Sequence, residues 1–131
     1  MKRLVSMSVM VMTILLSGLC AYGWTTPLME GTVGKYKVKM KLDVNDDTGQ
    51  VGGWYYYASK GPKSKITLSG KGAMFDEEGT VLVEKVKGQQ TGKFVGTLWM
   101  GSSMGVHSYG YSGTWISPAG KRLEFEVSAM E

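Results

Sequence analysis

The chain has little of what most enzymes and metalloproteins use at their sites. It contains one cysteine, Cys20, and one histidine, His107, in 131 residues. A lone thiol excludes an internal disulfide and a zinc site built from thiolates. A nucleophilic triad would have to use the single imidazole of His107, and no acid or nucleophile stands at a fixed spacing from it. No Gly-rich loop leads from a strand into a helix, so no phosphate cradle is expected.

Blocks of one charge sign are also missing. The chain has 15 Lys and Arg against 11 Asp and Glu, a formal net charge of +4. The lysines are scattered, and Lys35, Lys37, Lys39 and Lys41 alternate with other residues as on the wet face of a strand. A weak attraction to anionic surfaces stays open. We expect no nucleic-acid partner.

The one long apolar run stands at the N-terminus. Lys2 and Arg3 precede the apolar and small residues Leu4–Cys20, and Ala21-Tyr22-Gly23 offers a small-x-small cleavage site. This order is typical of a cleavable signal peptide. We therefore predict that residues 1–23 are removed and that residues 24–131 form one exported domain, periplasmic or extracellular, without cysteine.

Two other interpretations of this leader stay open. A retained transmembrane anchor is one, although a run of about 17 residues is at the short limit for a span and no basic stop-transfer cluster follows. The other is lipid attachment at Cys20, although Leu19 stands where a lipoprotein signal usually has a small residue. After cleavage at Gly23 we expect no membrane span.

Glycine is abundant and patterning is strand-like. The chain has 19 glycines but only three prolines. From Tyr36 to Val44, five apolar residues alternate with four charged ones, which is the period of a half-buried strand. The expected strands are Tyr36–Val44, Val51–Ser59, Ile66–Gly70 (extending at most to Phe75), Thr80–Lys87, Lys93–Met100, Val106–Ile116 and Arg122–Ala129, with Gly101–Gly105 as a loop.

No window after the leader has a helical period. Seven to eight strands joined by short turns predict an all-β, antiparallel up-and-down meander. Closing such a sheet removes its exposed edges, so we expect a small closed or nearly closed barrel. A β-sandwich is the alternative.

Carboxylates offer two candidate features. Asp43-x-Asn45-x-Asp47 is similar to the start of a calcium loop, but its glycine comes one place late, at Gly49, and Trp54 stands where Glu is needed. These acids are better explained by turn chemistry. Glu84 shares strand parity with Leu82, so it points inward if that face is the inner one. It then either anchors a ligand or has internal hydrogen-bond partners; the alternative is that Glu84 faces water.

Aromatic side chains are the remaining candidates for a binding site. Residues 54–57, Trp-Tyr-Tyr-Tyr, put aromatics on both faces of one strand. Amphipathic aromatics line many ligand sites, and they also fill barrels. The candidate ligand-binding residues are Trp54, Tyr56, Glu84, Trp99, His107, Tyr109 and Tyr111.

Short motifs also carry a resemblance. Val51-Gly-Gly-Trp-Tyr-Tyr-Tyr57, Ile66-Thr-Leu-Ser-Gly70, Val81–Glu84, Phe94–Gly96, Ser112–Trp115 and Leu123–Phe125 occur in succession. This succession resembles a group of small secreted bacterial β-proteins and, in its general pattern, the avidin-like and lipocalin-like barrels. The resemblance implies a meander barrel and no particular activity. The avidin ligand set has no residue-by-residue counterpart, so biotin binding is not implied.

Together these features favour an exported, non-enzymatic binding or interaction protein without a cofactor or metal. One version holds a small apolar or aromatic ligand inside, near Trp54, Tyr56 and Trp99. A second version uses loops such as Gly101–Gly105 to bind or inhibit a secreted protein. A small hydrolase is the third interpretation, and it would need Glu84 and a turn acid, or His107, to converge in one cleft.

Overall fold

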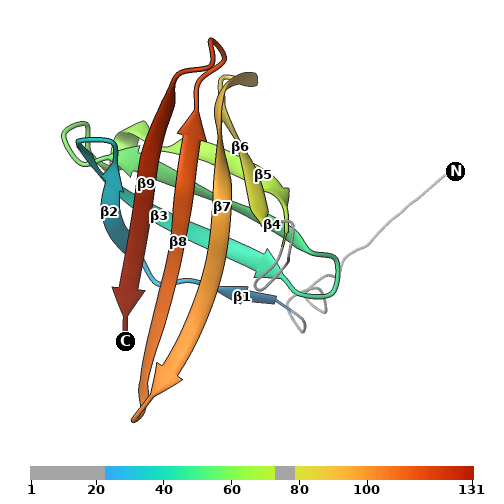
Figure 1. The fold of residues 1–131 in the computed structure, drawn as a ribbon, viewed down its shortest axis with the longest axis vertical. Coiled ribbons are helices and arrows are strands. Elements are labelled where there is room, and N and C mark those ends of the chain that lie inside the picture. Colours follow the sequence, from blue (N-terminus) through green and yellow to red (C-terminus); the bar gives the residue numbers. More distant parts are fainter. Residues whose placement is uncertain (1–22, 73–78) are drawn as a thin grey trace, which may run out of the picture.

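The computed structural model describes residues 23–72 and 79–131, and in both parts the chain is almost entirely β-strand (Figure 1). The predicted leader lies outside the described residues except for Gly23, and so do Cys20 and Phe75. Among the described residues, no helix is long and apolar enough to span a membrane. The elements are β1 (Gly23–Thr25), β2 (Met29–Val33), β3 (Tyr36–Asn45), β4 (Gln50–Tyr57), η2 (a 3-10 turn, Pro62–Ser64), β5 (Ile66–Lys71), β6 (Thr80–Val86), β7 (Gln89–Ser103), β8 (Val106–Ile116) and β9 (Arg122–Met130).

The strands β2 to β9 form a closed eight-stranded antiparallel barrel. Each strand pairs with the next along the chain, and β9 returns to pair with β2, with Gly31 opposite Val127. The predicted all-β up-and-down barrel is therefore confirmed, and the sandwich alternative is excluded. The short strand β1 is an addition. It lies along the same edge of β3 as β2 does, with Trp24 opposite Val44.

A buried threonine joins β1 to β2. The Thr26 amide donates to the carbonyl of Leu42 at 2.8 Å, and the Leu42 amide donates to Thr26 Oγ1 at 3.0 Å. These two bonds continue the pairing with β3 where the strand itself is interrupted. The segment from Gly23 to Val33 thus behaves as one broken strand along β3.

Alternation along each strand fills the interior of the barrel. On β3 the apolar residues point inward, while Lys37, Lys39 and Lys41 are more exposed on the outer face, as predicted. Burial of the inward side chains supplies the main stabilising free energy. The interior is a continuous core formed by Met29, Val33, Val38, Met40, Leu42, Val44, Val51, Tyr55, Leu68, Leu82, Phe94, Leu98, Tyr111, Phe125 and Val127.

Glycines at inward positions allow the strands to bend around this core. A Cβ on Gly70 would overlap the carbonyl of Val81 on β6, and one on Gly96 would overlap the carbonyl of Ser112 on β8. No side chain fits between backbones that approach so closely. The high glycine content therefore serves strand curvature as well as turns.

Three local expectations were wrong. Strands β1 and β2 were not predicted. Strand β7 already begins at Gln89, and most of the expected loop Gly101–Gly105 is strand, because Gly101, Ser102 and Ser103 each pair with β8. The hairpin turns only at Met104 and Gly105, both with positive φ.

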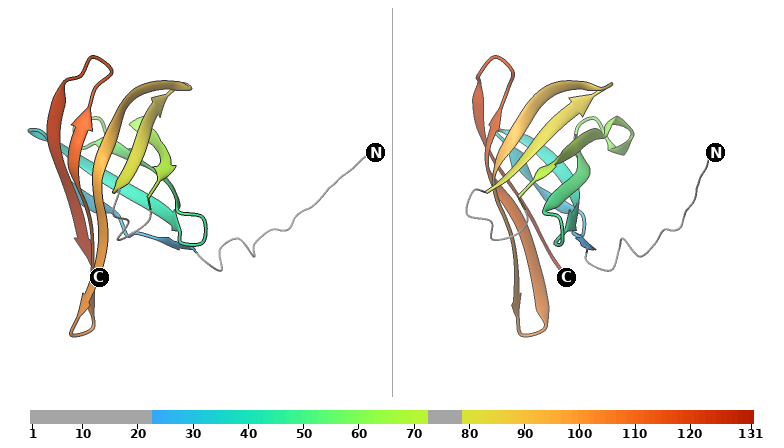
Figure 2. Two further views of the ribbon diagram at one scale, coloured as in Figure 1. Left: turned by 45° about the vertical axis from the view of Figure 1, so that its right-hand side comes forward. Right: turned by 90° about the vertical axis from the view of Figure 1, so that its right-hand side faces the viewer.

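The β7–β8 hairpin consequently projects past the rest of the barrel (Figure 2). Strand β6 pairs with β7 only as far as Gly96, and β2 pairs with β9 only between Phe125 and Ser128. Beyond these points β7, β8 and β9 continue as a three-stranded sheet. We call residues 99–109 together with 129–131 the extension.

Candidate functional site

Glu84 lies inside the barrel and has hydrogen-bond partners for both carboxylate oxygens. Its side chain is 5% exposed. Oε1 accepts from the Tyr55 hydroxyl and, at 3.0 Å, from Trp115 Nε1. Oε2 accepts from Thr91 Oγ1 at 2.7 Å. Of the alternatives that the sequence left open, the structure has Glu84 pointing inward with internal hydrogen-bond partners, which come from β4, β7 and β8.

This arrangement joins four strands, β6 through Glu84 and β4, β7 and β8 through its partners, at one level of the barrel. Burial, and then the hydrogen bond to Glu84, raise the pKa of Tyr55 far above its ordinary value, so the phenol stays a donor. Three donors to one carboxylate compensate for the loss of water around the charge. Glu84 therefore acts in the structure as a satisfied internal acceptor.

Tyr111 is also a core residue. Its hydroxyl donates to the carbonyl of Thr80 at 2.7 Å and lies 3.3 Å from that of Phe94. Its ring packs against Phe125 with centroids 4.8 Å apart. Burial raises the pKa of this phenol as well. Tyr111 thus joins β8 to β6 and β7.

Trp54 and Tyr56 lie on the outer face of β4, where they do not border the interior. The alternate residues Tyr55 and Tyr57 take the inward positions, so the prediction of aromatics on both faces is confirmed. The two outer rings stack at 6.0 Å and 21°, and Lys65 Nζ lies 4.1 Å from the centre of the Trp54 ring. A ligand inside the barrel would not touch this pair.

The other candidate residues belong to β7 and β8 and to the extension. Trp99 covers Gly110 on the outer face, where a Cβ would collide with the indole. Tyr109 is on the opposite face, with its ring 6.0 Å from that of Trp24. His107 is exposed, and its backbone exchanges hydrogen bonds of 2.8 and 2.9 Å with Glu131.

The seven candidate residues therefore do not form one site. Glu84 and Tyr111 are internal, Trp54 and Tyr56 form an outer pair, and Trp99, His107 and Tyr109 are divided between the two faces of the hairpin. Asn45 Oδ1 accepts the amides of Asp47 and Thr48 within the β3–β4 turn, and the carboxylates of Asp43 and Asp46 accept from Thr25 and Trp24 of β1. Within residues 23–72 and 79–131, no group of three His, Cys, Asp or Glu could hold a metal ion.

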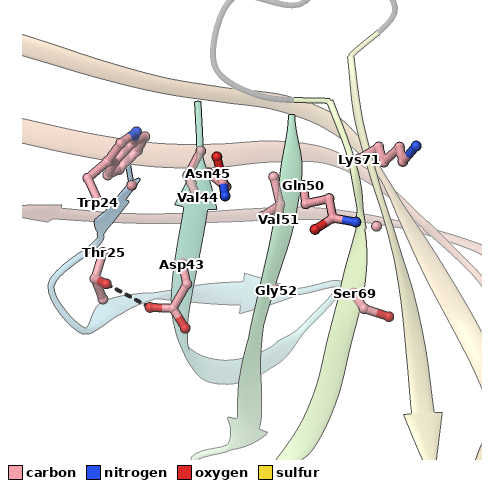
Figure 3. Close-up of a pocket in the computed structure, with 12 residues that line it drawn as sticks. Trp24, Thr25, Asp43, Val44, Asn45, Gln50, Val51, Gly52, Ser69 and Lys71 are labelled. Carbon is pink, nitrogen blue, oxygen red and sulfur yellow. Dashed lines mark hydrogen bonds between the residues drawn. The ribbon is translucent and has the colours of Figure 1, made fainter. Parts of the chain in front are cut away.

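Two hollows meet at Trp24, a residue that sequence reasoning did not select. The larger, about 720 Å³, is bordered by β1, the end of β3, the start of β4 and the end of β5 (Figure 3). Here Thr25 Oγ1 donates to Asp43 at 2.7 Å, as the dashed line in Figure 3 shows. The second, about 600 Å³, lies between the inner face of the extension, at Met100 and Tyr109, and the segment formed by β1 and the β3–β4 turn. Trp24 Nε1 donates to Asp46 at 3.2 Å across its border.

The extension is also where exposed apolar side chains gather. Met104 at the turn is 99% exposed and Met130 is 75% exposed, and Met100 and Val106 are partly exposed beside them. From Phe94 to Gly120 the sequence has no Asp, Glu, Lys or Arg. The projecting part of the β7–β8 hairpin, without Asp, Glu, Lys or Arg and with exposed methionines, is unusual for a surface that faces only water.

No family model, curated protein or solved structure matches the chain. The functional interpretation therefore depends on the geometry alone.

Proposed function

We propose that this chain is an exported, non-enzymatic interaction protein that binds another protein chain through the extension. The observation that carries the proposal is the contrast between the two parts of the molecule. The inward positions of the barrel are filled by the protein's own side chains, whereas exposed methionines and Val106 gather on the projecting hairpin. Methionine side chains adapt to partner surfaces and are frequent at binding sites.

The other versions have less support. A small ligand inside the barrel would have to displace core residues such as Tyr55 and Phe94, which are fully buried. A hydrolase would need a free acid or base, but the Glu84 carboxylate is engaged by three donors. His107 is on the exposed hairpin and not beside Glu84.

A site-specific cross-link tests this proposal. A photoreactive amino acid replaces Met104 in the full chain, expressed in its own host, and irradiation is followed by mass spectrometry of the adducts. Lys63 in η2, also exposed but away from the hairpin, provides the matched control position. We expect a defined protein adduct from position 104 and none of that identity from position 63. No adduct from either position, or the same adducts from both, would contradict the proposal.

A further inference from the structure

Within residues 23–72 and 79–131, part of strand β7 has one edge without a partner strand. On one side, β8 pairs with β7 from Lys93 to Ser103. On the other side, β6 stops at Gly96. Among the described residues, no strand pairs with Thr97–Ser103 on that side, so this stretch of backbone is open, as is the short end of β9 beyond Ser128.

The hydrogen-bond pattern tells which groups face this edge. In an antiparallel sheet, each residue directs both its N–H and its C=O to one neighbouring strand, and the next residue directs them to the other. His107 exchanges both bonds with Glu131 on the β9 side. Ser108 therefore directs its groups to β7, where Gly101 is its partner. It follows that Leu98, Met100 and Ser102 direct theirs to the open edge.

This edge also lacks the usual protection. Natural sheets guard exposed edges with lysine, proline, bulges or very short strands. Thr97–Ser103 has no charged residue and no proline, and its register with β8 is continuous. By contrast, β3 carries Lys37, Lys39 and Lys41 although both of its edges are paired. Thr97–Ser103 itself therefore presents neither a charged side chain nor a proline to a partner strand.

We infer that the β7 edge pairs antiparallel with the β7 edge of a second copy of this chain. The inference rests on the proposed function, because it names the partner of the extension. Antiparallel pairing about a twofold axis makes one edge complementary to itself. The three free residues of each copy would then form roughly six backbone hydrogen bonds between the copies.

The lack of charge on the hairpin allows a second copy as the occupant. Two copies carry net charge of the same sign, +4 each for the full chain and +2 each without Lys2 and Arg3 of the predicted leader, so their charged surfaces repel each other. The projecting part of the β7–β8 hairpin does not contribute to this repulsion, since no Lys, Arg, Asp or Glu occurs from Phe94 to Gly120. Two uncharged edges meet without repulsion, and the Met100 side chains of the two copies lie close enough to pack together. The result is one sheet that runs through both barrels.

Sedimentation equilibrium and amide hydrogen exchange on the purified protein test this inference. We expect the mass to rise from one chain to two with concentration. Exchange at the amides of Leu98, Met100 and Ser102 should slow as the dimer forms. The amides of Trp99 and Gly101, which already bond to β8, should change little. This alternating pattern distinguishes strand pairing from contact between the exposed methionines alone.

Ser102→Pro and Ser102→Ala form a matched pair of variants. Proline removes one N–H from the open edge and leaves the bonds to β8 in place. Alanine keeps that N–H and removes only the hydroxyl. We expect Ser102→Pro to weaken dimerisation by roughly tenfold or more, the effect of losing about 1.4 kcal/mol, and Ser102→Ala to leave it unchanged. Circular dichroism checks that both variants keep the barrel.

The outcomes separate the two proposals. A protein that stays monomeric up to millimolar concentration, or a dimer that Ser102→Pro does not weaken, overturns the second-copy inference. If position 104 nevertheless cross-links to a different protein, the proposed function stands with another partner. If the chain neither dimerises nor cross-links through Met104, both proposals fail.

Discussion

Replacing Glu84 by alanine should destabilise the barrel much more than replacing it by glutamine. Alanine removes the acceptor of three hydrogen bonds and leaves Tyr55, which is fully buried, with an unsatisfied hydroxyl. Trp115 Nε1 and Thr91 Oγ1 are only partly buried, so water can replace part of what they lose. An unsatisfied buried donor costs about 1–3 kcal/mol. With the partial losses at the other two donors, we expect Glu84→Ala to lower the free energy of unfolding by about 2–4 kcal/mol.

Glutamine keeps most of this arrangement. Its carbonyl oxygen can take the place of Oε1 and accept from Tyr55 and Trp115, while its amide group donates to the hydroxyl of Thr91. Neutral hydrogen bonds are weaker than charge-assisted ones, but a buried charge no longer has to be desolvated. We therefore expect Glu84→Gln to cost about 1 kcal/mol or less.

Urea unfolding followed by tryptophan fluorescence measures both variants. Adding Tyr55→Phe to the Glu84→Ala variant provides the control, because a hydroxyl that has already lost its acceptor should cost little when it is removed. If Glu84→Gln is as destabilising as Glu84→Ala, the charge matters and not the acceptor geometry. If Glu84→Ala stays within about 0.5 kcal/mol of the natural chain, Glu84 does not hold the strands together and the reasoning is wrong.

The remaining predictions concern pH, strand curvature and the leader. Because the folded-state pKa values of Tyr55 and Tyr111 are raised, stability should be fully present below the unfolded pKa of about 10 and fall above it. Each phenol should contribute about 1.4 kcal/mol per pH unit, and alkaline urea titration of Tyr55→Phe should show a smaller slope. Gly96→Ala should cost about 2–3 kcal/mol in the same assay, because its Cβ would overlap Ser112. The control Gly52→Ala, whose Cβ would stand 3.7 Å from its nearest neighbour, should be close to neutral. Protein recovered outside the cytoplasm should begin at Trp24 by N-terminal sequencing, and an uncut chain confined to the cytoplasm would disprove the predicted signal.

Much of the barrel could be predicted because inner and outer residues differ in kind. The alternation of Lys37, Lys39 and Lys41 with apolar residues shows which face of β3 is buried, whichever strands lie beside it. Strand β2 has no such contrast, since Gly31 occupies one of its inward positions and only five residues are involved. The Gly/Ser segment Gly101–Ser103 has little strand preference of its own, and it is a strand because β8 lies beside it.

The candidate residues could be chosen by type but not by location. Parity placed Glu84 and Leu82 on one face, and the structure agrees. Parity could not say which face of β4 was inner, because Trp54 and Tyr55 are equally suited to a core. The open edge of β7 could not be predicted from the sequence either, since it depends on where β6 begins and ends relative to the longer strand β7.

The seam between β2 and β9 has a consequence for how the molecule is made. Val33 and Phe125 pair although roughly 90 residues separate them along the chain. While synthesis is still in progress, strands β2 to β8 can curve but cannot close the barrel, because β9, which pairs with β2, is made after them. Without β9, strands β2 and β8 would each have an unpaired edge. Such fragments should be prone to aggregation and rapid degradation.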